Sequence, residues 1–297
     1  MNTMDRRGFL KVAGVGGALL LTYPGSGALA AAAGAGKGFS FVQFADTHVG
    51  YANPPVNPDA SASLQKGVDW VNAMTPQPDF VVFTGDLTHT TDDPQERRRR
   101  LTEFKRIAGG LKPKAVYFLP GEHDAGLDWG EAYKEILGKT HYMFQHKGVH
   151  FLVIDNVSDP AASVGEAQLA WIAAELARIP KADPLVVLTH RPLFDLYPEW
   201  DWATKDADKV LALLEPHTNV TVLYGHIHQE HHHQSGHIGQ HAGMSTAYLL
   251  PAPGSVPKKA PVPWDAAAPY KGMGLRIVQD DVAKPTPEFT EKPLAGM

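Results

Sequence analysis

The segment VTVLYGHIH (220–228) is an apolar, strand-like run that ends in two histidines. Four other runs end in histidine or carboxylate residues in the same way: FVQFADTH (41–48), FVVFTGD (80–86), VYFLPGEHD (116–124) and LVVLTH (185–190). In an open α/β sheet, ligands bind outside the carboxyl ends of the strands, where these side chains fall. Five such segments in one chain predict an α/β protein with a metal site at its strand ends.

Two of the segments carry metal-ligand residues at alternate positions. Asp46 and His48 are separated by one residue, and so are His226 and His228. In extended backbone, positions i and i+2 face the same side, so we expect both side chains of each pair to reach one ion.

The other three segments add further candidates. Asp86 follows Gly85, where a missing side chain allows close approach of backbone and ligand, and its two oxygens can bridge two cations. His190 and the run Glu122-His123-Asp124 end the remaining strands. Each residue alone suits a turn or a cap equally well. Together they favour a metal centre, because it is improbable that all five strands end in metal-ligand residues by chance.

Composition limits the chemistry. The 297 residues suffice for one or two domains, with ordinary apolar (43%) and charged (20%) fractions. A net charge of −5 argues against a nucleic-acid-binding protein. The absence of cysteine excludes disulfides, zinc–thiolate sites and thiol catalysis. Imidazole and oxygen ligands suit iron, manganese or zinc without choosing between them.

The N-terminus has the pattern of a targeting segment. Paired arginines in MDRRGFLK (4–11) precede a modestly apolar run (12–23) and the A-x-A sequence Ala28-Leu29-Ala30. We interpret residues 1–30 as a twin-arginine signal peptide and 31–38 as a flexible leader. A membrane anchor is the alternative, but the apolar run is far shorter than about 20 residues. We therefore expect twin-arginine export to the periplasm or the extracellular space, without stable membrane insertion.

The remaining chain, 39–297, is predicted to be a single domain in which strands alternate with helices. Paired strands are expected within 142–157, with a hairpin corner at 146–148, and a last strand at 273–280. The proline- and alanine-rich segment 251–269 is predicted to be an extended, wrapping loop. Two packed sheets with helices outside are indicated. Helical spacing predicts helices over 59–74, 94–108, 131–137, 166–179 and 204–214.

The five blocks, in this order, resemble the calcineurin-like metallophosphoesterases, whose pattern is D-x-H, G-D, G-N-H-[DE], H and G-H-x-H. The match runs from about residue 41 to 228. The resemblance implies a four-layer sandwich of two mixed β-sheets flanked by helices, with two metal ions at the strand ends. The implied ligands are Asp46, His48 and His228 for the first ion and Glu122, His190 and His226 for the second, with Asp86 bridging both.

The resemblance also implies a reaction. A hydroxide that bridges the two metal ions attacks the phosphorus of a small phosphoester in line. His123 lies beside the phosphate as general acid or charge stabiliser, oriented by Asp124. For Asp124, capping of the following loop is the alternative.

Glu122 departs from the family pattern, which has asparagine at this position. An ionised glutamate adds a negative charge. Its interaction energy with another unit charge ~4 Å away is on the order of a few kcal/mol. A ferric ion, a phosphodiester monoanion as substrate, or weak hydrolysis with another purpose would each accommodate it. We therefore expect a phosphodiesterase, cyclic nucleotides included. A phosphomonoesterase or nucleotidase, or a non-hydrolytic metal-binding protein on the same fold, are the alternatives.

Several other polar residues lie near these blocks. The histidines of 231–233, with His237 and His241, predict either an auxiliary metal-collecting loop, a part of the substrate site, or a polar hairpin without an ion, which we favour. His89 is a candidate for lining the pocket. Arg191 suits a phosphate oxygen or an ion pair with an acidic loop equally well.

The tryptophans Trp200, Trp202 and Trp264 fall in segments expected to be loops. Stacking on a nucleobase and packing against the domain are both open to them, and packing is the more common role.

Overall fold

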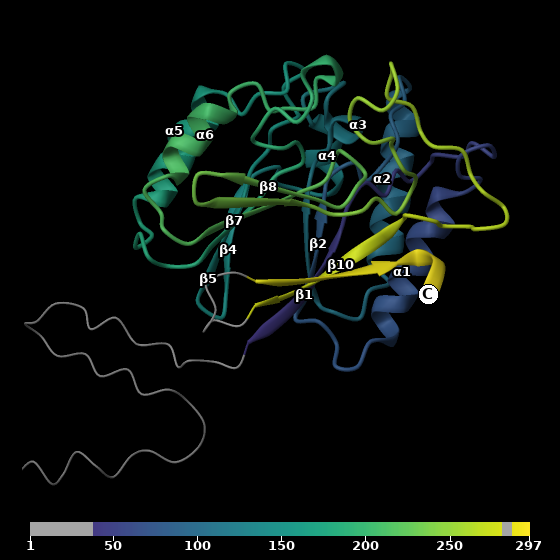
Figure 1. Ribbon diagram of the computed structural model, residues 1–297, viewed down its shortest axis with the longest axis horizontal. Helices are drawn as coiled ribbons and strands as arrows, with labels where there is room; N and C mark the ends of the chain where they lie inside the picture. Colours follow the sequence, from purple (N-terminus) through teal and green to yellow (C-terminus); the bar gives the residue numbers. More distant parts are fainter. Residues whose placement is uncertain (1–37, 281–286) are drawn as a thin grey trace, which may run out of the picture. The chain divides into compact units, whose positions relative to one another are not determined.

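The computed structural model describes residues 38–280 and 287–297 (Figure 1). The predicted signal peptide, 1–30, and the leader up to residue 37 lie outside the described residues, so twin-arginine export stays a prediction. None of the helices within the described ranges combines the length and the apolar character needed to cross a bilayer.

The first sheet is mixed and has five strands in the order β11-β10-β1-β2-β3. Strands β1, β2 and β3 run parallel to one another, with β3 at the edge. Strand β10 pairs antiparallel with both β1 and β11. The strand predicted at 273–280 is present as β10, but it is not the last strand, because β11 follows it. The strands are β1 (Phe39–Phe44), β2 (Phe80–Thr84), β3 (Ala115–Leu119), β10 (Gly274–Asp280) and β11 (Glu288–Pro293).

The second sheet is also mixed, with six strands in the order β4-β5-β6-β7-β9-β8. Strands β5, β6, β7 and β9 run parallel, and the hairpins β4–β5 and β8–β9 add antiparallel edges. The predicted corner after His146 is confirmed, with positive φ at Lys147 and Gly148. The strands are β4 (Tyr142–His146), β5 (Val149–Val153), β6 (Leu185–Leu188), β7 (Val220–Tyr224), β8 (His231–Ser235) and β9 (Ile238–Ala242).

Helices start where the sequence supplies caps. The Asp59 side chain accepts the Ala62 N–H at the start of α1, and Asp93 accepts the Gln95 N–H before Pro94 opens α2. The five predicted helices are present within a few residues of their expected ends. The α-helices are α1 (Ala60–Ala73), α2 (Pro94–Ala108), α3 (Glu122–Ala125), α4 (Glu131–Ile136), α5 (Glu166–Leu176) and α6 (Ala207–Leu214), with 3₁₀ turns η2 (Pro198–Trp200) and η3 (Leu294–Gly296).

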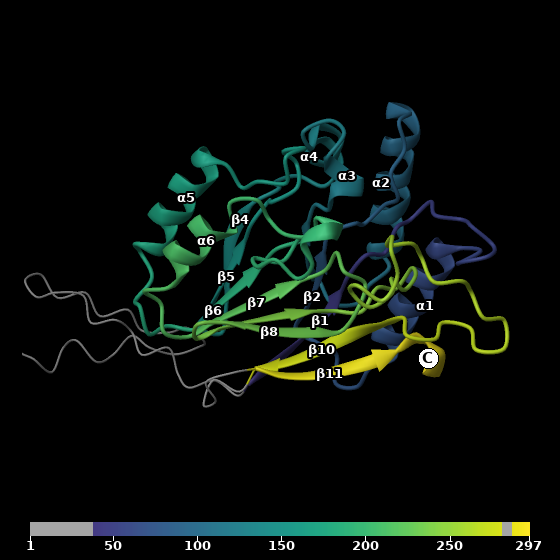
Figure 2. The same cartoon turned by 45° about the horizontal axis from the view of Figure 1, so that its top comes forward.

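The core has four layers, as predicted (Figure 2). Aromatic side chains of both sheets pack between them: the Phe41 ring lies 4.7 Å from that of Phe80 on the same sheet and 5.8 Å from that of Phe151 on the other. Helices α1 and α2 bury their apolar faces on the outer side of the first sheet, and α5 and α6 do so on the second. This packing fixes both sheets, so that the loops after their parallel strands are held on a rigid scaffold.

The proline-rich segment 251–269 has no helix or strand, in agreement with the predicted wrapping loop. Backbone hydrogen bonds tie it to the domain: Trp264 N–H donates to Pro55 O at 2.6 Å and Val262 N–H to Leu249 O at 2.9 Å. The segment is therefore held in place against the loop after β1.

Candidate metal centre

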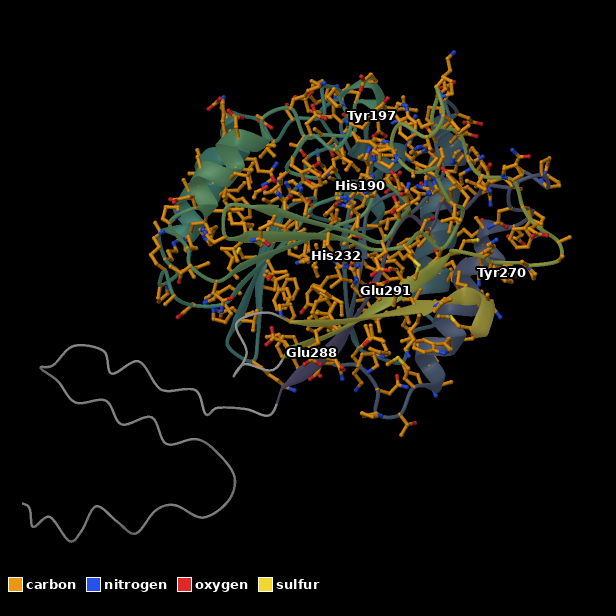
Figure 3. All side chains as sticks on the ribbon, in the orientation of Figure 1. His190, Tyr197, His232, Tyr270, Glu288 and Glu291 are labelled. Atoms are coloured by element: carbon orange, nitrogen blue, oxygen red, sulfur yellow. The ribbon has the colours of Figure 1, made fainter. Side chains whose placement is uncertain are left out.

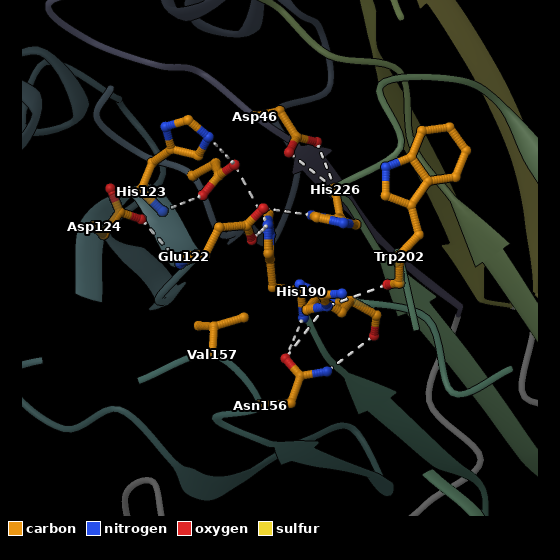
Figure 4. Close-up of polar contacts among 12 residues, drawn as sticks. Asp46, Glu122, His123, Asp124, Asn156, Val157, His190, Trp202 and His226 are labelled. Atoms are coloured by element: carbon orange, nitrogen blue, oxygen red, sulfur yellow. Dashed lines mark hydrogen bonds and ion pairs between the residues drawn. The ribbon is translucent and has the colours of Figure 1, made fainter. Parts of the chain in front are cut away.

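Seven side chains predicted as metal ligands lie together beyond the carboxyl ends of β1, β2, β6 and β7 and at the start of α3. Figure 4 labels Asp46, Glu122, His190 and His226 among them. They form two groups that share one carboxylate, and within each group the ligand atoms all lie within 4.8 Å of one another. The groups are Asp46, His48, Asp86 and His228, and Asp86, Glu122, His190 and His226.

Asp86 connects the two groups. Its Oδ2 lies 3.6 Å from His48 Nε2 and 3.5 Å from His190 Nε2. Its other oxygen, Oδ1, accepts the backbone N–H of His123 at 3.0 Å. One carboxylate oxygen thus faces an imidazole of each group, which is the arrangement that a bridging ligand needs.

The first group holds two imidazole nitrogens closer together than uncharged rings favour. His228 Nδ1 donates to Tyr248 O at 2.7 Å, so the Nε2 atom of the neutral ring carries a lone pair. This Nε2 lies 3.1 Å from His48 Nε2. Burial lowers the pKa of His48 well below its ordinary value and that of His228 to about 3, so neither ring is charged at neutral pH. With Asp46 Oδ1 at 3.5 Å from His228 Nε2, this donor set suits a cation.

The second group is organised around Glu122. Its Oε2 lies 2.8 Å from His190 Nε2, and its Oε1 lies 2.8 Å from His226 Nδ1. Glu122 Oε2, His190 Nε2 and His226 Nδ1 are nevertheless buried without hydrogen-bond geometry to any described residue. His190 Nδ1 donates to Thr84 O at 2.8 Å, which turns Nε2 toward the carboxylate. Unpartnered donor atoms that converge in this way fit a second cation.

Charge is balanced within this second group. Burial alone raises the pKa of Glu122, but His226 and His190 outweigh it and hold that pKa well below its ordinary value. Burial alone lowers the pKa of His190, but Asp86 and Glu122 raise it well above the ordinary value. Glu122 and His190 therefore each favour the charged form of the other.

The backbone at the site is strained. Five of the seven residues have positive φ, a region that non-glycine residues rarely adopt. These are Asp46 (53°), His48 (43°), Asp86 (48°), His226 (68°) and His228 (56°). The alternation argument was therefore wrong, because neither D-x-H nor H-x-H is extended. His226 and His228 belong to different groups, while Asp46 and His48 share a group through a turn.

Two glycines allow the segments to approach. A Cβ on Gly85 (φ 87°) would lie 2.3 Å from His190 Nδ1, and one on Gly121 would lie 2.1 Å from the backbone nitrogen of Asp86. These positions bring β2, β6 and α3 into contact at the site, which is the close approach expected at Gly85.

The sequence profile of the calcineurin-like phosphoesterases matches residues 39–230, more than half of the chain. The chain belongs to this family. The family resemblance of the five sequence blocks is thereby confirmed. The fold of this family is that of enzymes with two metal ions, and the two groups of candidate ligands agree in number with two ions.

Curated relatives of the chain have two kinds of names. A 3′,5′-cyclic-nucleotide phosphodiesterase of Nostoc is 25% identical over 181 residues, 59% of this chain and 65% of its own length. CpdA of Haemophilus influenzae, a 3′,5′-cyclic adenosine monophosphate phosphodiesterase, is 28% identical, covering 51% and 55%. Human CPPED1, a serine/threonine-protein phosphatase, is 27% identical, covering 56% and 58%. The chain thus spans under two thirds of these three proteins.

Solved structures support the fold. A dimetal phosphatase from Danio rerio superposes with a TM-score of 0.58 over 87% of this chain and 100% of its own, at 13% identity. GAP50, the anchor in the inner membrane complex of Plasmodium, superposes with a TM-score of 0.50 over 82% and 84%, at 12% identity. The two mixed sheets flanked by helices are thus a fold that this chain shares with these two solved structures.

His123 and Asp124 have different surroundings from those expected for an oriented acid. The Asp124 carboxylate accepts the N–H groups of Leu87, Thr88 and Gly121 and the Thr88 hydroxyl, at 2.6–3.0 Å. His123 Nδ1 instead accepts the Thr90 N–H at 3.2 Å. The predicted direct orientation of His123 by Asp124 is therefore not what these contacts show. Asp124 joins the loop after β2 to the start of α3, so it caps segments that precede it rather than the following loop that the alternative named.

The contact from Thr90 fixes the His123 tautomer. Because Nδ1 accepts, the proton of the neutral ring lies on Nε2, which is 3.9 Å from Asp86 Oδ2. His123 thus directs a proton toward the carboxylate shared by the two groups.

His89 and Tyr248 line the first group. His89 Nδ1 lies 3.3 Å from His48 Nδ1, and the His89 ring stacks on that of His123 at 4.9 Å. The Tyr248 hydroxyl lies 3.3 Å from His48 Nε2. The pocket-lining hypothesis for His89 agrees with these contacts, whereas Tyr248 was missed because no motif or strand-end signal surrounds it in the sequence.

Other candidates lie away from the ligands. The buried Arg191 donates to the carbonyls of Trp202 and Ala203, so it supports this loop rather than an open anion site. The rings of His232 and His241 lie 6.1 and 4.6 Å from that of Phe289 of β11. Figure 3 labels His232 and two other residues of β11, Glu288 and Glu291. Within the described part of the chain, no group of three metal-ligand side chains includes residues 231–241. Strands β8 and β9 form an antiparallel hairpin over this stretch, as favoured from the sequence.

Proposed function

We propose that this protein is an exported hydrolase of a small phosphoester that uses two metal ions. The observation that carries the proposal is Asp86, whose Oδ2 faces His48 and His190 of the two ligand groups at 3.6 and 3.5 Å. A shared carboxylate between two groups of imidazoles is the arrangement that binuclear hydrolysis requires.

In this proposal, Asp46, His48 and His228 would hold one ion, and Glu122, His190 and His226 would hold the other. Asp86 belongs to both groups and would be a ligand to both ions. When bound, two such cations supply Lewis-acid activation of the ester and of a water molecule. Iron, manganese and zinc all suit these ligands. The strained backbone at five of these residues holds the side chains in place before any ligand arrives.

His123 has the position of a proton donor. Its Nε2–H points to the shared carboxylate, and its side chain is 25% exposed, so a substrate can reach it. We assign to His123 the protonation of the leaving oxygen or the stabilisation of charge on the phosphoryl group. His89, stacked on this ring, keeps its orientation.

The charge of Glu122 favours a phosphodiester. A diester carries one negative charge and a monoester up to two, so an additional carboxylate at the site repels the diester less. The cyclic-nucleotide phosphodiesterases of Nostoc and Haemophilus influenzae support this preference. The relatedness to CPPED1 phosphatases supports the alternative, a phosphomonoesterase or nucleotidase.

The decisive experiment compares esters and metals. The purified mature protein, loaded separately with Mn²⁺, Fe²⁺ and Zn²⁺, is assayed with bis-p-nitrophenyl phosphate, p-nitrophenyl phosphate and cyclic AMP. We expect faster turnover of the diesters, and its loss in His123→Ala with two metal equivalents retained. A higher rate on the monoester selects the phosphomonoesterase.

Tight metal binding without turnover of any ester would favour the non-hydrolytic alternative. Glu122 is its main support, and the fold of GAP50, named as an anchor, shows that this scaffold is found in proteins named for other roles.

Export is proposed from the N-terminal sequence alone. Replacing Arg6 and Arg7 by lysine should retain the protein in the cytoplasm, as measured by cell fractionation. Because twin-arginine signals direct folded proteins, we expect the metal ions to be installed before export. Metal analysis of the natively exported protein tests this expectation.

A further inference from the structure

The second ligand group contains two carboxylates. Glu122 places a carboxylate where the family pattern has a neutral amide, and Asp86 lies in the same group. A phosphoester that approaches this side of the centre meets two carboxylates. A nearby cationic side chain would offset this repulsion.

Lys259 brings such a cation from the proline-rich segment 251–269. Its Nζ donates to Trp200 O at 3.0 Å and lies 5.5 Å from the centroid of the Trp202 ring, as in a cation–π contact. An ammonium has three N–H donors, and the contact with Trp200 uses one. The side chain is exposed, so the other donors are accessible to a ligand.

Trp202 links this lysine to the ligand group. Its ring lies 6.4 Å from that of His226 at an interplanar angle of 81°, on the side of His226 away from Glu122 (Figure 4). Trp202 is fully buried, and its Nε1–H has no acceptor among the described residues. A buried donor without a partner is unfavourable, so an acceptor from outside the chain would be favoured here.

The electrostatics agree with this placement. Desolvation lowers the pKa of Lys259, and Glu122 is the largest influence that raises it, with Asp86 also contributing. The field of the metal centre therefore reaches Lys259. Arg191, the other cation close by, is engaged with loop carbonyls.

We propose that Lys259 and the Trp202 N–H form a binding site for an anionic phosphate oxygen beside the second ligand group. The proposal rests on the proposed function, because it deepens the account of how the same site takes its phosphoester. Lys259 supplies a positive charge that offsets the carboxylate of Glu122, and its contacts with Trp200 and Trp202 hold it in place. The ligand class is a phosphoester or inorganic phosphate.

Three variants test the site on the metal-loaded protein. Lys259→Met removes the charge and keeps the stem, Lys259→Arg keeps the charge, and Lys258→Met is the matched control one residue away in the same segment. The probe is inorganic phosphate, titrated by calorimetry, so that the measurement does not depend on turnover. Metal content is measured for each variant, and Trp202→Phe tests the indole N–H.

We expect Lys259→Met to weaken phosphate binding about tenfold and Trp202→Phe about threefold, with Lys259→Arg and Lys258→Met within about twofold of wild type. Where esters are turned over, KM for the substrate should rise by the same factor. Equal losses in Lys258→Met and Lys259→Met, no loss in Lys259→Met, or loss of metal in Lys259→Met would each overturn the proposal. Absence of ester turnover with phosphate binding that still depends on Lys259 would contradict the hydrolase and leave this site standing.

Discussion

The carboxylate of Glu122 lies 2.8 Å from His226, measured from Oε1 to Nδ1, and its other oxygen lies equally close to His190. One side chain thus spans both histidines of the second ligand group. The glutamate that departs from the family pattern therefore lies among the candidate ligands, where its charge would act directly on a second ion.

Replacing Glu122 should affect the second ion alone. Glu122→Ala is expected to lower the affinity for the second metal equivalent by on the order of 100-fold, because a charged ligand is lost, while the first equivalent stays bound. Glu122→Asn keeps an oxygen donor and should shift the ratio of monoester to diester turnover toward the monoester. Metal analysis after dialysis, together with both ester assays, checks these outcomes. Loss of both ions in Glu122→Ala would contradict the division into two groups.

Asp86 and Asp46 make a matched pair of carboxylates. Because Asp86 belongs to both groups, Asp86→Asn should lose both metal equivalents and lower turnover by about 100-fold or more. Asp46 belongs to the first group alone, so Asp46→Asn should release one equivalent and keep the other. Titration with Co²⁺, followed by its visible absorption, distinguishes the two. If both variants release one ion, Asp86 does not bridge.

The positions of the strand ends were predicted well from the sequence. The backbone conformation of the residues that follow the strands was predicted less well. Apolar runs such as LVVL before His190 are local signals, and the sheet brings their carboxyl ends to one edge. Asp and His adopt left-handed backbone more often than most residues do, but the sequence does not show where they adopt it, so alternation gave the wrong geometry at Asp46 and His226. Tyr248 reaches His48 across 200 positions, which no local pattern encodes.

Short elements were also beyond the sequence. The four-residue helix α3 carries Glu122 and His123, yet it has too few residues for a helical period to be recognised. Its position depends on Asp124, whose partners lie near residue 87 of another strand end. A carboxylate beside a catalytic histidine suggested an orienting role, and only the three-dimensional contacts reveal the capping role.

Asp124 and His123 should therefore separate stability from activity. Burial and Asp86 raise the pKa of Asp124 to about 6, so at neutral pH the carboxylate is ionised and accepts its four hydrogen bonds. Asp124→Asn should cost about 2 kcal/mol, or roughly 4–8 °C in Tm. His123→Asn, at a part-exposed ring, should change Tm by less than about 2 °C while abolishing turnover. Calorimetry and the diester assay check both; an unchanged Tm in Asp124→Asn would contradict the capping role.

His89 should make the metal-free protein sensitive to mild acid. Its folded-state pKa is lowered from 6.5 to about 4, first by burial and then by His123. Between these values the unfolded chain binds more protons than the folded one, so stability is lost as pH falls from 6.5 toward 4. Because the ring is part-exposed, its share is on the order of 1 kcal/mol. Histidines with shifted pKa elsewhere in the site also contribute, so the test is a difference between variants.

Urea unfolding of chelator-treated protein at pH 7 and pH 4.5 measures that difference. His89→Gln should lose less stability over this interval than wild type, because glutamine binds no proton in either state. His237→Gln, on the exposed turn of the outer hairpin, is the control for removing a histidine outside the site. Equal losses in wild type and His89→Gln would show that protonation of His89 is not opposed by folding. In that case a protonated His89 ring would lie beside His48 in the folded protein without loss of stability.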